Sequence, residues 1–197
     1  MDDLPPSVRR ATRDDALALA ELIDMAGDGV PSIFWARMAQ AGESPMAVGR
    51  RRARREDDSF SYRNALVIDP GAGPVAALLG YPLPDRPEPI PPDLPAKFVP
   101  FQELENLAGG TWYVNALATY PGHRGQGHGT RLLGIAEHRA RVLRCRALSL
   151  AVVDANAGAR RLYERLGFRA AASRPLPRGD WPGPGDNVLL LVRDLNR

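Results

Sequence analysis

Apolar residues recur with helical spacing in some segments of the chain and form short continuous runs in others. The elements predicted for the first 81 residues are a strand at 8–11, a helix from Thr12 to about Gly27, a helix through 33–38, an arginine-rich helix or loop after it, and strands at 64–69 and 75–81. The first helix has its apolar positions at Leu17, Leu19, Ala20, Leu22 and Ile23. Pro70-Gly71-Ala72-Gly73 separates the two strands and predicts a β-hairpin.

A proline-dense stretch covers residues 82–100. Proline lacks the amide donor that helices and strands need, so this density predicts a stretch without regular structure. The segments on either side are too incomplete to fold separately. We therefore interpret residues 82–100 as a surface loop within a single domain that spans residues 1–197, and such loops often shape binding sites.

Strands and helices alternate in the second half of the chain. After a short amphipathic segment around Phe101–Leu107, the predicted elements are strands at 112–118, 147–153, 168–173 and 188–192, and helices at 128–144 and 156–166. The apolar stripe of the first of these helices is Leu132, Leu133, Ala136, Ala140 and Leu143. This alternation predicts an α/β protein with at least one parallel strand pair joined by a crossover helix.

A glycine-rich loop, Arg124-Gly125-Gln126-Gly127-His128-Gly129, lies between a predicted strand and the helix that follows it. Glycines let the main chain approach a ligand, and a helix N-terminus presents unpaired N–H groups, so the loop predicts a pyrophosphate site. A glycine-rich turn without a ligand is the alternative. The loop lacks the lysine of a Walker A motif, and the positions of its glycines do not fit G-x-G-x-x-G.

The loop resembles the Arg-x-x-Gly-x-Gly signature of the GNAT superfamily of acyl-CoA N-acyltransferases, here Arg124, Gly127 and Gly129. The segment Asn156–Phe168 resembles that family's other hallmark, Asn-x-x-Ala-x-x-Leu-Tyr-x-x-x-Gly-Phe. The two motifs occur in the family's order and spacing, which makes the pair far more specific than either one alone.

The resemblance implies a mixed, mostly antiparallel central sheet with helices on both faces and a parallel strand pair that splays near Leu117 and Val152. It implies acetyl-CoA as co-substrate, with pantetheine in the gap between these strands and no metal. The residues implied in cofactor binding are Leu117, Ala118, Thr119, Arg124, Gly125, Gln126, Gly127, His128, Gly129, Thr130 and Asn156. Tyr163 is implied as the general acid that protonates the thiolate of CoA. An ordinary core tyrosine and a plain N-cap are the alternatives for Tyr163 and Asn156.

The base that deprotonates the attacking amine is not marked by a motif. Glu103 and Glu105 are the candidates, and the solvated face of a short helix is their alternative explanation. Asn115 lies inside the preceding strand and is a candidate to orient water or substrate. The predicted reaction is acetyl transfer to a primary amine, from a small molecule or a peptide, by direct attack in a ternary complex.

Composition and charge change this picture little. A net charge of +3 and the run Arg50–Arg55 raise nucleic acid as a partner, but Glu56, Asp57 and Asp58 follow the run and offset it. There is a single cysteine, no apolar run of membrane-spanning length and no signal-like N-terminus. We therefore expect a cytoplasmic protein that binds neither nucleic acid nor membrane.

Two alternatives to the enzyme remain open at this stage. A family member that has lost catalysis would bind CoA as a sensor or interaction module, whereas a nucleic-acid-binding protein would retain DNA in a salt-sensitive way and show no affinity for CoA. A homodimer is possible, since dimers are common in the family. The sequence does not identify the acceptor amine or the preferred acyl chain.

Overall fold

The computed structural model describes residues 4–177 and 183–195. They form two compact units, each assembled from separate stretches of the chain. The first unit contains the chain up to Gly80 together with Asn115–Ile135, and the second contains Tyr81–Val114 and the chain from Ala136 onward. Strand β4 (Trp112–Thr119) and helix α5 (His128–Val142) contribute residues to both units.

The first unit contains β1 (Val8–Arg10), β2 (Ala65–Ile68) and most of β3 (Ala76–Pro82). β1 pairs antiparallel with β2, and β2 and β3 form the predicted antiparallel hairpin. In the hairpin turn the carboxylate of Asp69 accepts hydrogen bonds from the backbone N–H groups of Gly71 (2.8 Å) and Gly73 (3.0 Å). The strand order in this unit is β1-β2-β3-β4.

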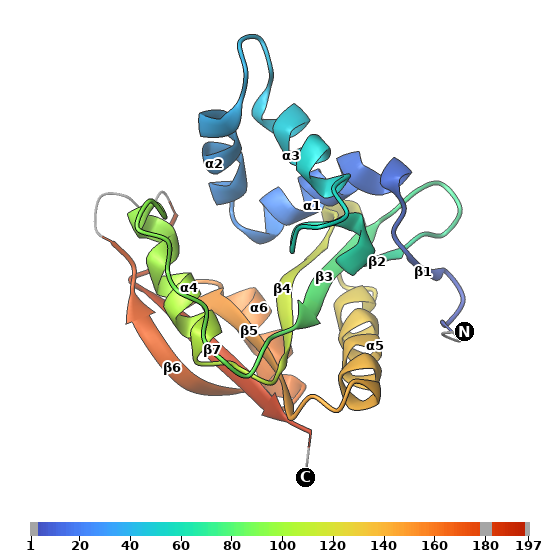
Figure 1. The fold of residues 1–197 in the computed structure, drawn as a ribbon. Helices are drawn as coiled ribbons and strands as arrows, with labels where there is room; N and C mark the ends of the chain where they lie inside the picture. The colour runs from blue at the N-terminus through green and yellow to red at the C-terminus, as the bar shows by residue number, and fades with distance from the viewer. Residues whose placement is uncertain (1–3, 178–182, 196–197) are drawn as a thin grey trace. The chain divides into compact units, whose positions relative to one another are not determined.

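Helices α1 (Ala16–Ala26), α2 (Val30–Met38) and α3 (Pro45–Ala53) lie together beside these strands (Figure 1). The arginine-rich segment is thus a helix over most of its length. Leu19 and Leu22 of α1 are buried as predicted, but Leu17 is 44% exposed. At 100° per residue, Leu17 lies about 200° around the helix from Leu19, so it faces away from the core.

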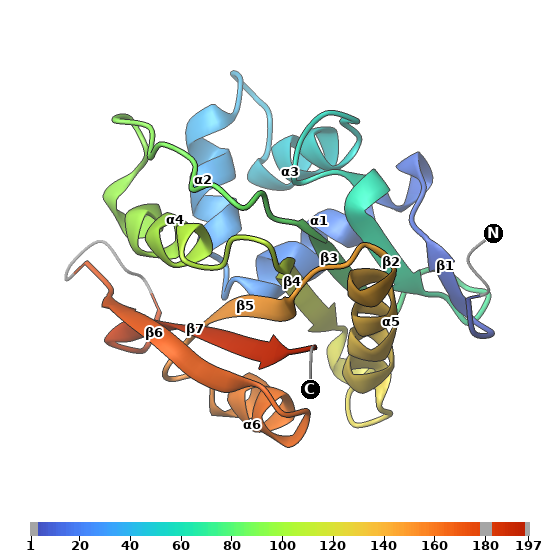
Figure 2. The same cartoon turned by 60° about the horizontal axis from the view of Figure 1, so that its bottom comes forward.

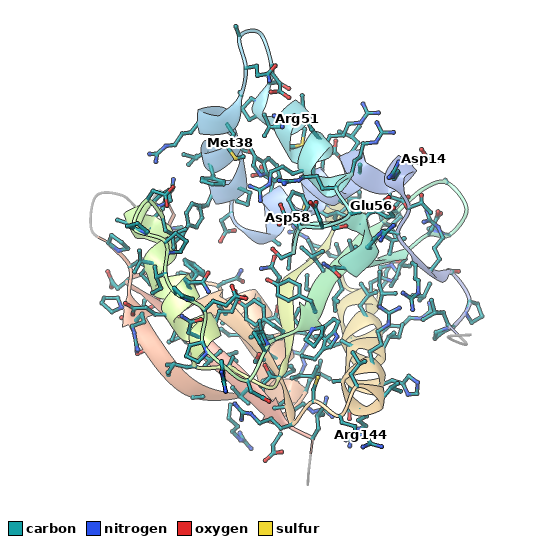
Figure 3. The ribbon with its side chains drawn as sticks, in the orientation of Figure 1. Asp14, Met38, Arg51, Glu56, Asp58 and Arg144 are labelled. Carbon is teal, nitrogen blue, oxygen red and sulfur yellow. The ribbon has the colours of Figure 1, made fainter. Side chains whose placement is uncertain are left out.

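Three arginines of the run Arg50–Arg55 form ion pairs with acidic neighbours. Arg51 is paired with Glu43, and Arg52 and Arg55 are both paired with Asp58 at 3.2 Å. Arg51 lies on α3, and Glu56 and Asp58 lie on the segment that follows it (Figure 3). Asp58 thus offsets part of the run as predicted, whereas Glu56 is paired with Arg13 and Arg63, which lie outside the run.

The second unit contains the other strands and helices: α4 (Val99–Asn106), β5 (Ala147–Val153), α6 (Ala157–Arg165), β6 (Arg169–Pro175) and β7 (Asn187–Asp194). The strand order is β4-β5-β7-β6, in which β4 and β5 are parallel and β7 is antiparallel to both of its neighbours. Helix α4 covers one face of these strands and α6 lies on the other (Figure 2). Leu104 of α4 and Val188 and Leu190 of β7 form the core beneath α4.

Two predicted details are wrong. The irregular segment ends at Pro95, because a short 3-10 turn at Ala96–Phe98 leads into α4, whose first turn contains Pro100. Proline is tolerated there, since the first N–H groups of a helix have no intrahelical partner. Leu143 is 56% exposed, because α5 ends at Val142 and Arg144 then takes a left-handed φ of 58°.

Among the described residues, no helix is both long and apolar enough to cross a lipid bilayer.

Candidate active site

The glycine-rich loop has the backbone conformation that its glycines allow. Gly125 and Gly127 take φ values of 76° and 78°, a region that residues with a Cβ rarely adopt. A Cβ built on either glycine would meet no protein atom within 4 Å, so the main chain is open on that side. Helix α5 begins at His128, directly after the loop. Its first N–H groups and the positive end of its dipole suit an anionic pyrophosphate.

Contacts within the first unit hold the approach to this loop. The Tyr120 hydroxyl donates a 2.5 Å hydrogen bond to Glu21 of α1, and burial together with this carboxylate raises the pKa of Tyr120. The side chain of Arg124 donates to the carbonyl oxygen of Thr119 at 3.2 Å. Arg124 therefore supports the main chain at the end of β4, a structural role that the family signature did not reveal.

The pairing of β4 with β5 is short. Three residue pairs are in register, from Trp112 with Leu148 to Val114 with Leu150, although β4 continues to Thr119 and β5 to Val153. Of the predicted binding residues in this part of β4, Asn115 is exposed and Leu117, Ala118 and Thr119 are half-buried. The register agrees with the predicted splay of a parallel pair.

Helix α6 has the termini predicted from its motif. The side-chain oxygen of Asn156 accepts a 3.1 Å hydrogen bond from the N–H of Ala159, so Asn156 is the N-cap. Gly167 takes a φ of 85° after the last turn. The chain then places Phe168 in the core, where its ring meets that of Tyr163 edge-on with centroids 5.7 Å apart. These contacts fix Tyr163 at the end of α6.

Tyr163 is 7% exposed, and burial raises its pKa to about 12. It therefore keeps its proton at neutral pH. Among the described residues, its hydroxyl oxygen is not one of the buried side-chain atoms that lack a hydrogen-bond partner.

Glu105 of α4 has the ionisation expected of a general base. Its pKa is raised to about 7, first by burial and then by the negative charge of Glu88, while a hydrogen bond from Tyr81 acts in the opposite direction. At pH 7 a carboxyl group with this pKa is divided about equally between its two forms. It can both accept and release a proton there, which suits acid–base catalysis.

Glu103 lies on the same helix but is engaged elsewhere. Its carboxylate accepts a 2.6 Å hydrogen bond from Nε of Arg174 on β6. This ion pair already engages the carboxylate of Glu103 with a cation of another element. Of the two glutamates, Glu105 has the surroundings of a proton acceptor.

Two further tyrosines, which the sequence reasoning missed, accompany Glu105 and Tyr163. The rings of Tyr81 (β3) and Tyr113 (β4) are 6.0 Å apart. Burial raises the pKa of Tyr113, and so, to a smaller extent, do the charges of Glu105, Tyr81 and Tyr163. Tyr81, Glu105, Tyr113 and Tyr163 therefore form one group in the second unit, called the tyrosine–glutamate cluster below. The sequence does not predict this cluster, because a tyrosine in a strand gives the same pattern whether it lies in the core or in a functional site.

Comparison with known proteins gives a consistent result. Residues 32–168 match the model of the Acetyltransferase (GNAT) family. No curated protein matches the sequence.

Several solved structures are similar in fold. One described as an acetyltransferase is 18% identical with a TM-score of 0.64, covering 95% of this chain and 98% of that one. An N-acetyltransferase from Staphylococcus aureus Mu50 is 15% identical with a TM-score of 0.63, covering 94% and 99%. A chain of the NatC complex bound to Gag peptide and CoA is 16% identical with a TM-score of 0.55, covering 95% and 97%. These similarities confirm the predicted fold class.

Proposed function

Since the chain belongs to the GNAT acetyltransferase family, whose model matches more than half of it, we propose that it transfers an acetyl group from acetyl-CoA to a primary amine by direct attack. The observation that carries this proposal is the tyrosine–glutamate cluster. It combines Glu105, a carboxyl group with a pKa of about 7, with Tyr163, a buried phenol that keeps its proton. A base and an acid are the two proton-transfer groups that aminolysis of a thioester requires.

We assign the pyrophosphate of acetyl-CoA to the main-chain N–H groups of the glycine-rich loop and the first turn of α5. The residues that supply them are Gly125, Gln126, Gly127, His128, Gly129 and Thr130. The positive φ values of Gly125 and Gly127 and the open space beside them support this assignment. Anionic groups at such helix N-termini gain from both the N–H donors and the helix dipole.

The remaining cofactor contacts follow from the family motifs. We assign the acetyl carbonyl to main-chain N–H groups of Leu117, Ala118 and Thr119, which lie beyond the residues of β4 that pair with β5. Asn156 uses its side-chain oxygen as the cap of α6, and we assign its amide group to the pantetheine arm. Asn115, exposed on β4, is assigned to the acceptor.

In this scheme Glu105 removes a proton from the ammonium group of the acceptor, which frees the lone pair of its nitrogen. The lone pair forms a bond to the thioester carbon, and the resulting oxyanion is held by main-chain N–H groups. The carbon–sulfur bond then breaks as Tyr163 donates its proton to the departing sulfur, and the second proton leaves the nitrogen and restores the hydroxyl of Tyr163. The products are the N-acetylated amine and CoA with its thiol restored, and Glu105 releases its proton to solvent.

The high pKa of Tyr163 is compatible with this role. A thiol ordinarily ionises near pH 8.5, well below the pKa of about 12 for Tyr163. A thiolate that forms in the same buried surroundings is destabilised by the same loss of solvation, which raises its own proton affinity. Burial thus keeps Tyr163 protonated before the reaction and makes the sulfur a stronger acceptor during it.

We further propose that the two units act as one catalytic domain. The family match begins in the first unit, enters the second at Tyr81, returns to the first over Asn115–Ile135 and ends in the second, so both contribute to the family's pattern. The glycine-rich loop belongs to the first unit and Tyr163 to the second. Cytoplasmic location and dimerisation remain predictions.

A panel of primary amines assayed with acetyl-CoA and a thiol reagent tests this proposal. Release of CoA that depends on both the amine and the protein is the expected result, with the acetylated amine identified by mass spectrometry. Binding of acetyl-CoA without turnover of any amine in a broad panel would contradict catalysis and favour the CoA-binding sensor. Absence of acetyl-CoA binding would contradict the family function altogether.

A further inference from the structure

A small pocket lies between the proline-rich segment and α4, within the second unit. Its polar lining comes from Arg86 and Glu88 of the segment and from Gln102, Glu105 and Asn106 of α4. Glu105 is the base in the proposed reaction, so the nitrogen of the acceptor has to reach its carboxyl group. The other side chains of the pocket are then placed to meet the groups that the acceptor carries beside its nitrogen.

Hydrogen bonds hold the two walls of this pocket together. The side chain of Asn106 accepts from the N–H of Glu88 at 3.0 Å and donates to its carbonyl oxygen at 2.8 Å. The main chain next to Arg86 is therefore attached to the helix that carries Glu105. The side-chain carboxylate of Glu88 takes no part in these two bonds.

The pocket contains charges of both signs. Glu88 and Glu105 supply carboxyl groups, and Arg86 supplies a guanidinium group. Among the described residues Arg86 forms no ion pair, whereas Arg174 of the same unit is paired with Glu103. An acceptor with a single positive charge would leave Arg86 without an anion, and a second ammonium group would be repelled by it. A carboxylate beside the amine matches the lining better than either.

We propose that the acceptor is an α-amino acid, whose carboxylate binds the guanidinium of Arg86 while its ammonium group meets Glu105. This inference rests on the proposed function and names its substrate class. Arginine can bind a carboxylate through two parallel N–H···O bonds, so Arg86 would determine specificity without taking part in proton transfer.

The apolar part of the lining guides the choice of probes. It comes from Leu83, Pro84 and Pro87, which suit a small aliphatic side chain. The probes are therefore L-alanine, L-alaninamide and 1,2-diaminopropane, which share one carbon framework and carry a carboxylate, a neutral amide or a second ammonium group beside the amine. We expect kcat/KM of the wild type for L-alanine to exceed that for L-alaninamide by about 10-fold or more, and 1,2-diaminopropane to be the poorest acceptor.

The variant Arg86→Gln tests the assigned residue, with Arg169→Gln as the matched control. Arg169 is exposed at the start of β6 and does not line the pocket. Arg86→Gln should lower kcat/KM for L-alanine by about 10- to 100-fold, the loss expected for hydrogen bonds between charged groups, and leave that for L-alaninamide nearly unchanged. Arg86→Lys keeps the charge and should retain part of the activity toward L-alanine. Arg169→Gln should behave as the wild type with all three probes.

Two results of these assays would overturn the inference. The first is an equal loss for L-alanine and L-alaninamide in Arg86→Gln, because a purely structural arginine would affect both acceptors alike. The second is a wild type that prefers 1,2-diaminopropane, which would indicate a second ammonium group bound beside Glu88.

Calorimetry separates this inference from the proposed function. L-Alanine is titrated into wild type, Arg86→Gln and Arg169→Gln, each saturated with CoA. Weaker binding to Arg86→Gln than to the other two proteins supports the inference even if no amine is acetylated. Equal binding to all three proteins, or no binding to the wild type, overturns it even if the wild type acetylates other amines.

Discussion

The substitution Glu88→Gln tests whether Glu105 is the base. Glu88 itself has no role in the proposed chemistry, so the test acts on Glu105 only through the charge of Glu88. Glu88 lies in the irregular segment before α4, and its negative charge raises the pKa of Glu105. Removing that charge leaves burial as the cause that raises this pKa and the hydrogen bond from Tyr81 as the cause that lowers it. The pKa of Glu105 should therefore fall in Glu88→Gln.

The expected magnitude follows from the exposure of Glu88. Burial is the largest cause of the rise of the Glu105 pKa from 4.5 to about 7, so Glu88 contributes the smaller share. A charge at the exposed surface acts through an effective dielectric close to that of water, which limits its effect to about 1 kcal/mol at short range. The midpoint should move by up to about 0.7 pH unit toward lower pH.

The measurement is kcat/KM for one amine from pH 5.5 to 8.5, followed through release of CoA thiol. In the wild type only about one tenth of Glu105 is ionised at pH 6, so the acid limb should have its midpoint near pH 7. The acceptor's own titration affects wild type and variant alike and cancels in their comparison. Salt at 1 M should reduce the difference between them, since Glu88 is exposed.

Glu103→Gln is the matched control. It carries the same change on the same helix, but its carboxylate is paired with Arg174 and does not act on the pKa of Glu105. Its midpoint should equal that of the wild type. An unchanged midpoint in Glu88→Gln, or one that moves to higher pH, would refute the assignment of Glu105 as the base.

Three further predictions concern other parts of the site. Tyr163→Phe should lower kcat by about 100-fold with little change in acetyl-CoA affinity, as expected for loss of a general acid, and equal turnover would remove Tyr163 from that role. Gly127→Leu should abolish acetyl-CoA binding in calorimetry, because a φ of 78° is strained for leucine and the leucine side chain would occupy the open space beside the loop. Gly122→Ala is the control and should bind acetyl-CoA normally, because Gly122 also has open space beside it but no positive φ. Glu105→Gln should unfold at higher urea concentration than the wild type at pH 8 and at the same concentration at pH 4. The raised pKa of Glu105 lowers the free energy of unfolding of the wild type as pH rises from 4.5 through about 7, by up to about 3 kcal/mol. A variant that is less stable than the wild type at pH 8 would contradict this.

The parts of the site that depend on local sequence could be predicted. Asn156 caps α6 and Gly167 ends it, because both roles are set by the backbone within one helical turn. The positive φ values at Gly125 and Gly127 follow from the same local rule.

The chemistry that depends on distant segments could not be predicted. Glu105 and Glu103 look equivalent on one amphipathic helix, and only the fold places Arg174 beside one of them and Tyr81 and Glu88 beside the other. Tyr113 escaped notice for a similar reason, since a tyrosine in an apolar strand has the pattern of a core residue. The exposure of Leu143 depends on where α5 ends, a boundary that periodicity alone sets only to within a few residues.

The attachment of the proline-rich segment to α4 links this segment to the pKa of Glu105. The side chain of Asn106 accepts a hydrogen bond from the N–H of Glu88 at 3.0 Å and donates one to its carbonyl oxygen at 2.8 Å. These two hydrogen bonds hold the backbone at Glu88 against α4, the helix on which Glu105 lies. Any exchange of this segment that removes or moves Glu88 should therefore change the pKa of Glu105. Variants of the segment should be assayed over a range of pH, because activity lost at one pH can reappear at another.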